Sequence, residues 1–256
     1  MPTADITRLA VLIDSDNTTA SLTKALLEEI AKYGTPTVKR AYGDWTTQHL
    51  VGWKDELLLH AIQPIQQFAY TRGKNSTDSA LIIDAMDLLY ARNVEAFAIV
   101  SSDSDFTRLA TRLRESGMIV YGLGRRNTPP AFVSACDRFI YLDLLNPQPQ
   151  DPALPAPHSA SNDEEPAPPL LNLKRILSAA ISSTSKDDGW SHLGEVGSYL
   201  VKSHAAFDPR DYGHPKLGEL ARAQAYVELK EVPGPTGTNH LLVRLKPPPS
   251  RASRTR

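Results

Sequence analysis

The chain has 256 residues and a mass of 28.1 kDa, with 41% apolar residues and a formal net charge of -1. This length allows a buried core and more than one domain. The longest apolar runs fall short of the about 20 residues that a membrane helix needs. The single cysteine, Cys136, excludes an internal disulfide or a cysteine-rich zinc site. Residues 1–9 lack the charged start and apolar stretch of a signal peptide, so we expect a cytoplasmic protein without a membrane segment.

Within residues 1–145, short apolar runs alternate with amphipathic stretches, which is typical of a parallel sheet covered by helices. We expect strands at residues 8–13, 37–43, 62–69, 95–100, 118–123 and 138–142. We expect helices between them at residues 19–34, 47–60, 76–93 and 105–116. The predicted fold is α/β, with a central, mostly parallel sheet in a three-layer domain.

Aspartates follow the predicted strands at three places, in "VLIDSDNTT", "GKNSTDSAL" and "SSDSDF". They are Asp14, Asp16, Asp78, Asp103 and Asp105. The carboxyl ends of parallel strands face one crevice, where ligands bind in such folds. We therefore expect the five carboxylates to converge there.

Five carboxylates in one crevice repel one another unless a cation lies among them. Mg²⁺ and Mn²⁺ prefer oxygen ligands and keep several waters, and such an ion polarises a phosphodiester and lowers the pKa of a bound water. We predict that Asp14, Asp78 and Asp103 hold Mg²⁺ or Mn²⁺, that Asp105 adds a ligand, and that Asp16 could also reach the ion. The same residue types cap helices, but a cap needs only one per helix, so the surplus at three strand exits favours a site.

The first motif also fits a different enzyme class. "DSDNT" matches the DxDx[TV] start of haloacid dehalogenase-type phosphatases, in which the first aspartate, here Asp14, accepts the phosphoryl group and the second, here Asp16, is an acid/base. Lys74 could take the role of that family's lysine, but Asp78 would then be unexplained and no cap-sized insertion follows Asp16. A phosphatase stays an alternative.

Four blocks resemble, in order and spacing, those of an NYN domain, a LabA-like relative of PIN-domain nucleases. The blocks are "VLIDSDNTTASL", "RGKNSTDSALIIDAMDLLY", "IVSSDSDFTRLATRLRESGMIVYGLG" and "TPPAFVSACDRFIYL". The resemblance covers nearly all of residues 5–145 and implies a PIN-like fold and metal-dependent cleavage of RNA. The site positions that it implies are Asp14, Asn17, Asp78, Asp103 and Asp105, whereas Asp16 stands where the family varies. Asn17 can also brace the Asp14 loop through side-chain hydrogen bonds.

The remainder of the chain differs in composition and charge. Residues 146–169 are rich in Pro, Ala, Ser and acidic residues, which predicts a disordered linker, and residues 247–256 predict a basic disordered tail. Residues 170–256 carry 13 Lys and Arg against 8 Asp and Glu, whereas residues 1–145 carry 15 against 17. The C-terminal part is therefore the one suited to a polyanion.

Residues 170–246 predict a small winged-helix domain, with three helical stretches followed by a hairpin across "PGPTGT". This part resembles the OST-HTH, or LOTUS, domain. The matching positions are Gly189, Trp190, Leu193, Phe207, Tyr212 and Leu217. The resemblance implies RNA binding, with a protein partner as the alternative, and a tethered RNA-binding domain would raise the substrate concentration at the crevice.

Basic side chains in both domains are candidates for contacts with RNA phosphates. In the LOTUS-like domain they are Lys202, Arg210, Lys216 and Arg222. Beside the acidic crevice they are Arg72 and Lys74 in "TRGK" and Arg125 and Arg126 in "GLGRR". We predict a metal-dependent ribonuclease, and an RNA-binding adaptor that does not cleave is the other open alternative. The sequence leaves the oligomeric state open.

Overall fold

The computed structural model describes residues 7–68, 76–145, 171–233 and 239–246 of the chain. The chain divides into two compact units, Met1–Pro168 and Pro169–Arg256. The predicted linker at 146–169 and tail at 247–256 lie outside the described residues. In the part that the structure describes, no helix is long and apolar enough to cross a membrane.

The N-terminal unit is built on a six-stranded sheet with the order β3-β2-β1-β4-β5-β6, in which every neighbouring pair is parallel. The strands are β1 (Arg8–Asp14), β2 (Thr35–Gly43), β3 (Gln63–Gln66), β4 (Ala96–Val100), β5 (Ile119–Gly124) and β6 (Arg138–Tyr141). Every residue of β4 is buried, and in β1 only Arg8 is exposed. Strands buried on both faces read as continuous apolar runs, which is why "LAVLI" and "AFAIV" form the centre of the sheet.

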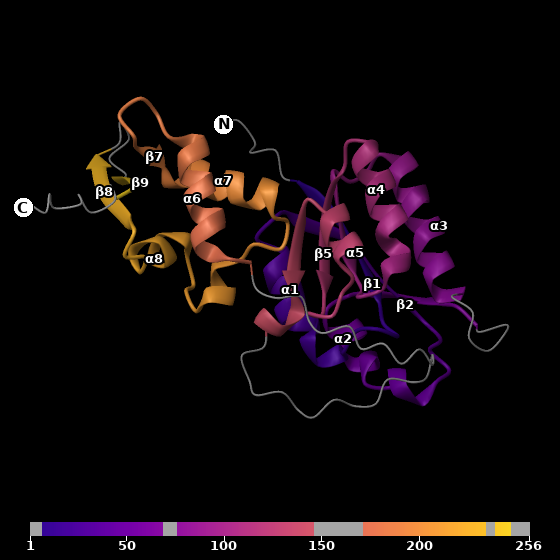
Figure 1. Ribbon diagram of the computed structural model, residues 1–256. Helices are drawn as coiled ribbons and strands as arrows, with labels where there is room; N and C mark the ends of the chain where they lie inside the picture. Colours follow the sequence, from indigo (N-terminus) through magenta and orange to yellow (C-terminus); the bar gives the residue numbers. More distant parts are fainter. Residues whose placement is uncertain (1–6, 69–75, 146–170, 234–238, 247–256) are drawn as a thin grey trace, which may run out of the picture. The chain divides into compact units, whose positions relative to one another are not determined.

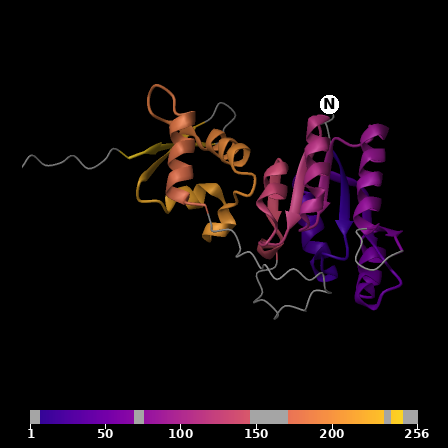
Figure 2. The same cartoon turned by 45° about the vertical axis from the view of Figure 1, so that its right-hand side comes forward.

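Helices cover both faces of this sheet (Figure 1). They are α1 (Thr23–Ile30), α2 (Trp53–Leu59), α3 (Ser76–Ala91), α4 (Thr107–Glu115) and α5 (Pro130–Ala135), with short 3-10 turns at Ala20–Leu22, Gln48–Leu50, Ser104–Phe106 and Leu142–Leu144. Side chains of α1 and α2 pack with the alternate residues Leu9, Val11 and Ile13 of β1 in one core cluster. Helix α3 contacts β1 and β2, and α4 contacts β5 and α5. Figure 2 shows the strands lying between the helical layers.

The α/β prediction is confirmed, with two differences. The sheet is wholly parallel rather than mostly parallel. Helix α5 was not predicted from the sequence. It begins with Pro130 at its first turn, where the missing N–H costs no hydrogen bond, so the Pro-Pro pair starts a helix instead of breaking the chain.

The C-terminal unit has the expected winged-helix content, three helices and an antiparallel hairpin, plus a short third strand. Its elements are α6 (Leu173–Thr184), β7 (Ser191–His192), α7 (Leu193–Ser203), a 3-10 turn at Pro209–Tyr212, α8 (Leu217–Arg222), β8 (Val227–Pro233) and β9 (Asn239–Leu245). The sheet order is β7-β9-β8. Its own core is formed by apolar side chains of α6, α7, α8 and the hairpin, including Leu177, Leu200, Leu220 and Val243.

Candidate active site

The carboxyl ends of β1 and β4 lie side by side at the middle of the sheet, because β1 pairs with β4 while the chain between them runs out through β2 and β3. At this point the strand order reverses and the loops after the two strands diverge, which is the place of the ligand-binding crevice in open α/β sheets. The loop after β1 begins at Ser15, and the loop after β4 contains Ser101 to Asp103. The predicted acidic residues of both loops therefore share one edge.

Asp14, the last residue of β1, is buried, with a relative exposure of 1%. Its Oδ2 accepts hydrogen bonds from Asn17 Nδ2 and Ser101 Oγ, both at 2.7 Å. Burial raises the pKa of Asp14, and these two hydrogen bonds oppose the shift. The other oxygen, Oδ1, is buried and has no hydrogen-bond partner among the described residues. An unpartnered buried carboxylate oxygen is costly, so this atom is a candidate ligand for a cation.

Ser101 links the two loops. Its Oγ donates to Asp14 and accepts a hydrogen bond from the backbone N–H of Asp103 at 3.1 Å. Asp103 in turn caps the following 3-10 turn, since its Oδ1 accepts from the backbone N–H of Asp105 at 2.8 Å. Ser101 was not among the predicted site residues. Its partner Asp14 lies 87 positions away, and only the pairing of β1 with β4 brings the two together.

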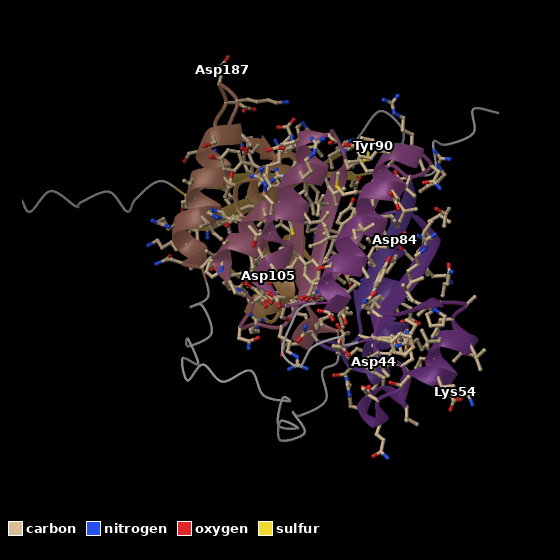
Figure 3. The ribbon with its side chains drawn as sticks, turned by 90° about the vertical axis from the view of Figure 1, so that its right-hand side faces the viewer. Asp44, Lys54, Asp84, Tyr90, Asp105 and Asp187 are labelled. Atoms are coloured by element: carbon tan, nitrogen blue, oxygen red, sulfur yellow. The ribbon has the colours of Figure 1, made fainter. Side chains whose placement is uncertain are left out.

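Asp78, in the first turn of α3, completes the cluster. One carboxylate oxygen each of Asp78, Asp103 and Asp105 lies within 4.8 Å of the others. Burial, followed by the charges of Asp14, Asp103, Asp105 and Asp16, raises the pKa of Asp78 to about 7. The charges of the other four predicted aspartates thus act on Asp78, although Asp14 and Asp16 lie outside the group of three. Figure 3 shows Asp105 with side-chain oxygen atoms gathered beside it, at the opposite end of the helical layer from Tyr90.

Both oxygens of Asp16 have protein partners. Oδ1 lies 3.1 Å from His49 Nε2, and Oδ2 accepts a hydrogen bond from Thr77 Oγ1 at 3.1 Å. The side chain thus ties the loop after β1 to the turn before α2 and to the first turn of α3. His49 and Thr77 were absent from the predicted site, because their partner Asp16 lies 33 and 61 positions away.

The basic loop after β5 borders the loop after β4. The backbone N–H of Arg125 donates to Ser102 Oγ at 2.8 Å, and the Arg125 side chain is exposed. The Arg126 guanidinium lies 4.7 Å from the centre of the Tyr141 ring, a cation–π contact. Gly124 allows the loop after β5 to lie close to the loop after β4, since a Cβ at this position would lie 2.6 Å from the Ser101 carbonyl oxygen. Arg72 and Lys74 lie outside the described residues.

The four basic candidates of the C-terminal unit have different surroundings. Lys202 is exposed and lines a groove beside α7. Arg210 pairs with Asp208 through two contacts, at 3.0 Å and 2.8 Å, and Arg222 lies 3.6 Å from Glu231. Lys216 is exposed at the start of α8. Among the four, Lys202 and Lys216 are the side chains without an ion pair within the described part of the unit.

The family model of the NYN domain matches residues 8–143, which contain the whole sheet and the acidic cluster. The chain belongs to the NYN domain family. The NYN domain is a PIN-like nuclease domain, so the crevice lies in a nuclease-type fold. A second model, that of the OST-HTH/LOTUS domain, matches residues 169–237 and supports a role of the C-terminal unit in RNA binding.

Solved structures are similar to parts of this chain. A protein of unknown function from Vibrio parahaemolyticus is 17% identical, with a TM-score of 0.47, and the match covers 56% of this chain and 97% of that one. A solution structure from Chromobacterium violaceum is 28% identical, with a TM-score of 0.26, and covers 32% of this chain and 91% of that one. An uncharacterized protein from Nitrosomonas europaea is 33% identical, with a TM-score of 0.27, over 40% and 94% of the two chains. The search of curated proteins gave no match.

Proposed function

We propose that this protein is a metal-dependent ribonuclease whose NYN domain hydrolyses RNA phosphodiester bonds. The observation that carries the proposal is the acidic cluster, in which oxygens of Asp78, Asp103 and Asp105 lie within 4.8 Å of one another. Asp14, whose buried Oδ1 has no hydrogen-bond partner among the described residues, lies at the same sheet edge, and its charge acts on Asp78. Carboxylates brought this close are destabilising without a counterion, so their arrangement favours a bound cation.

The donor set fits Mg²⁺ or Mn²⁺, since these ions prefer carboxylate oxygens and retain several waters. Asp14, Asp78, Asp103 and Asp105 would hold the ion, which when bound lowers the pKa of a coordinated water and neutralises charge on the phosphodiester. Asn17 and Ser101 orient the Asp14 carboxylate, because both donate hydrogen bonds to its Oδ2. Oδ1 would then be the oxygen of Asp14 that binds the ion. Asp16 is a positioning residue in this proposal, because His49 and Thr77 engage both of its oxygens.

The phosphatase alternative requires Asp14 as the nucleophile and Asp16 as the acid/base. Asp14 is 1% exposed and braced by two hydrogen bonds, and Asp16 bonds to Thr77 and His49. These contacts hold both carboxylates in place. They favour structural and ligand roles for Asp14 and Asp16 over the nucleophile and acid/base roles of a phosphatase. A non-cleaving RNA adaptor remains the second alternative, and the retained set of carboxylates favours turnover over it.

The test compares labelled single-stranded RNA, structured RNA and DNA as substrates, each with Mg²⁺, Mn²⁺ or EDTA. We expect cleavage of RNA that requires metal and stops in EDTA. Hydrolysis of a small phosphomonoester, a fluoride analogue of phosphate trapped on Asp14, and no RNA cleavage with either metal would together replace the ribonuclease by the phosphatase. RNA binding without any hydrolysis would favour the adaptor.

The LOTUS domain is proposed to recruit the RNA, and the chain between the domains to keep it near the crevice. Recruitment fits the excess of 13 Lys and Arg over 8 Asp and Glu in residues 170–256. A cytoplasmic location is part of the same proposal. The alternative is that this domain binds a protein partner. Experiments on RNA binding distinguish the two.

We predict that replacing Arg125 and Arg126 together by Ala weakens binding of RNA of any sequence and flattens its salt dependence. Each lost phosphate contact on a single strand lowers the logarithmic salt slope by about 0.7. Arg126 stacks on Tyr141, so the exposed Arg125 should account for most of the change. Binding is measured by titration at several salt concentrations on residues 1–145, so that the basic LOTUS domain cannot mask the loss.

Arg112→Ala is the control for this pair, because Arg112 lies in the last turn of α4, away from the crevice end of the helix. Metal binding should be unchanged in both variants. A salt slope equal to that of the wild type in the double variant would remove Arg125 and Arg126 from the RNA path.

A further inference from the structure

The LOTUS domain contains a groove of about 810 Å³ between α7 and the first residues of β9. Glu195, Tyr199 and Lys202 line it from α7, and they follow one another at spacings of four and three residues. Side chains at these spacings share one face of a helix. His192 of β7 and His240 of β9 line the groove as well. One face of α7 and the residues of β7 and β9 thus line a groove that contains both aromatic and charged side chains.

The rings of this groove are accessible. Tyr199 is 36% exposed. Within the described part of the LOTUS domain, no other large apolar side chain is exposed to this extent. The rings of His192 and His240 meet edge to face, with centres 5.9 Å apart. Trp190 is different, since Arg244 and Lys230 lie over its ring at 4.5 Å and 5.9 Å. Tyr199 is therefore the exposed aromatic side chain of the lining and the candidate for stacking with a ligand.

The groove offers a cation to a phosphate. Lys202 is exposed one helical turn from Tyr199, and residues 170–246 carry 10 Lys and Arg against 8 Asp and Glu, to which the sequence of the tail adds three Arg. An exposed His240 adds a ring nitrogen that can bind a phosphate oxygen. Glu195 is the acidic residue of the lining, and its carboxylate can accept a hydrogen bond from a base amino group or a ribose 2′-hydroxyl.

We propose that this groove binds unpaired nucleotides of RNA, with a base stacked on Tyr199 and a neighbouring phosphate at Lys202. Unpaired bases expose their faces for stacking on aromatic side chains, whereas bases in a duplex are covered by their neighbours. The inference deepens the proposed recruitment of RNA, because it assigns the contact to one surface of the LOTUS domain and to single strands. Arg210 and Arg222, which pair with Asp208 and Glu231, lie outside the lining of this groove.

The experiment uses the full chain carrying Asp103→Asn, without divalent metal, and a fluorescently labelled single-stranded RNA. Tyr199→Leu keeps an apolar side chain but removes the ring, and we expect binding to weaken about fivefold or more, the effect of one lost base–aromatic stack. Tyr199→Phe should bind like the parent. Lys202→Ala should weaken binding and flatten the salt dependence. Tyr90→Leu and Lys186→Ala replace exposed residues that do not line the groove and should bind like the parent.

A crosslink supplies a readout that does not depend on any variant. RNA containing thiouridine, irradiated in complex with the full chain, should attach to the peptide of α7, Leu193–Ser203, or to the start of β9. Unchanged affinity of folded Tyr199→Leu, together with crosslinks confined to other segments, overturns the proposal. Failure of the wild-type chain to bind RNA also overturns it and directs the search to a protein ligand. RNA binding with these effects, combined with no cleavage by the wild-type chain in Mg²⁺ or Mn²⁺, overturns the ribonuclease and keeps the groove.

Discussion

Asp103→Asn is expected to reduce RNA cleavage by at least about a thousandfold while the domain stays folded. Asp103 supplies one of the three carboxylate oxygens that lie within 4.8 Å of one another. A metal ion contributes several kcal/mol to stabilising a phosphoryl transition state, and each 1.36 kcal/mol corresponds to about tenfold in rate. An amide in place of the carboxylate removes the negative charge from this ligand position. The measurement is the initial rate on labelled RNA with saturating Mn²⁺ or Mg²⁺.

The fold should survive this change because Asn caps a helical turn as well as Asp does. The backbone N–H of Asp105 donates to Asp103 Oδ1 at 2.8 Å, and the Asn side-chain oxygen can accept the same bond. Asp55→Asn is the matched control, since Asp55 is exposed in the first turn of α2. Full activity of Asp103→Asn in a preparation free of contaminating nuclease would show that the metal site is assigned to the wrong residues.

The sheet and its acidic edge could be predicted because both depend on local patterns. Runs such as "LAVLI" and "AFAIV" are apolar at every position, as strands buried on both faces must be, and all β4 residues are buried. Once the strands are parallel, their carboxyl ends share an edge, so the aspartates that follow β1 and β4 must lie at the same edge. This step needs neither the strand order nor any side-chain position, whereas the closeness of the two loops follows from the pairing of β1 with β4.

The connections within the site depended on information that the sequence does not display. Ser101 contacts Asp14 only because β1 pairs with β4, and His49 meets Asp16 only because the turn before α2 closes on the loop after β1. The contrast between buried Asp14 and exposed Asp105 likewise follows from depth in the fold. Local patterns describe residue types at a strand exit, whereas partners and burial are set by distant segments.

Asp78→Asn is expected to stabilise the metal-free protein at neutral and higher pH. Burial and the surrounding carboxylates raise the pKa of Asp78 from 3.8 to about 7. Between these values the folded chain holds a proton that the unfolded chain releases, so the contribution of Asp78 to stability is full below pH 3.8 and is lost as the pH rises through about 7. Asn cannot ionise and escapes this loss. After allowance for solvent screening of a half-buried group, we expect on the order of 1–2 kcal/mol, or about 2–8 °C in melting temperature.

Divalent metal should reverse the order of the two proteins, which distinguishes a ligand from a carboxylate that is merely crowded. A metal that binds only the folded state adds about 2.7 kcal/mol at a hundred times its dissociation constant, and the wild type should gain this while Asp78→Asn gains little. Thermal melts in EDTA and in Mn²⁺ at pH 5 and pH 8 test both parts, with Asp87→Asn as the control because Asp87 is exposed on the same helix. Destabilisation of metal-free Asp78→Asn at pH 8 would contradict repulsion in the cluster. An equal metal-induced shift in both proteins would exclude Asp78 as a ligand, because binding energy that survives loss of the carboxylate cannot come from it.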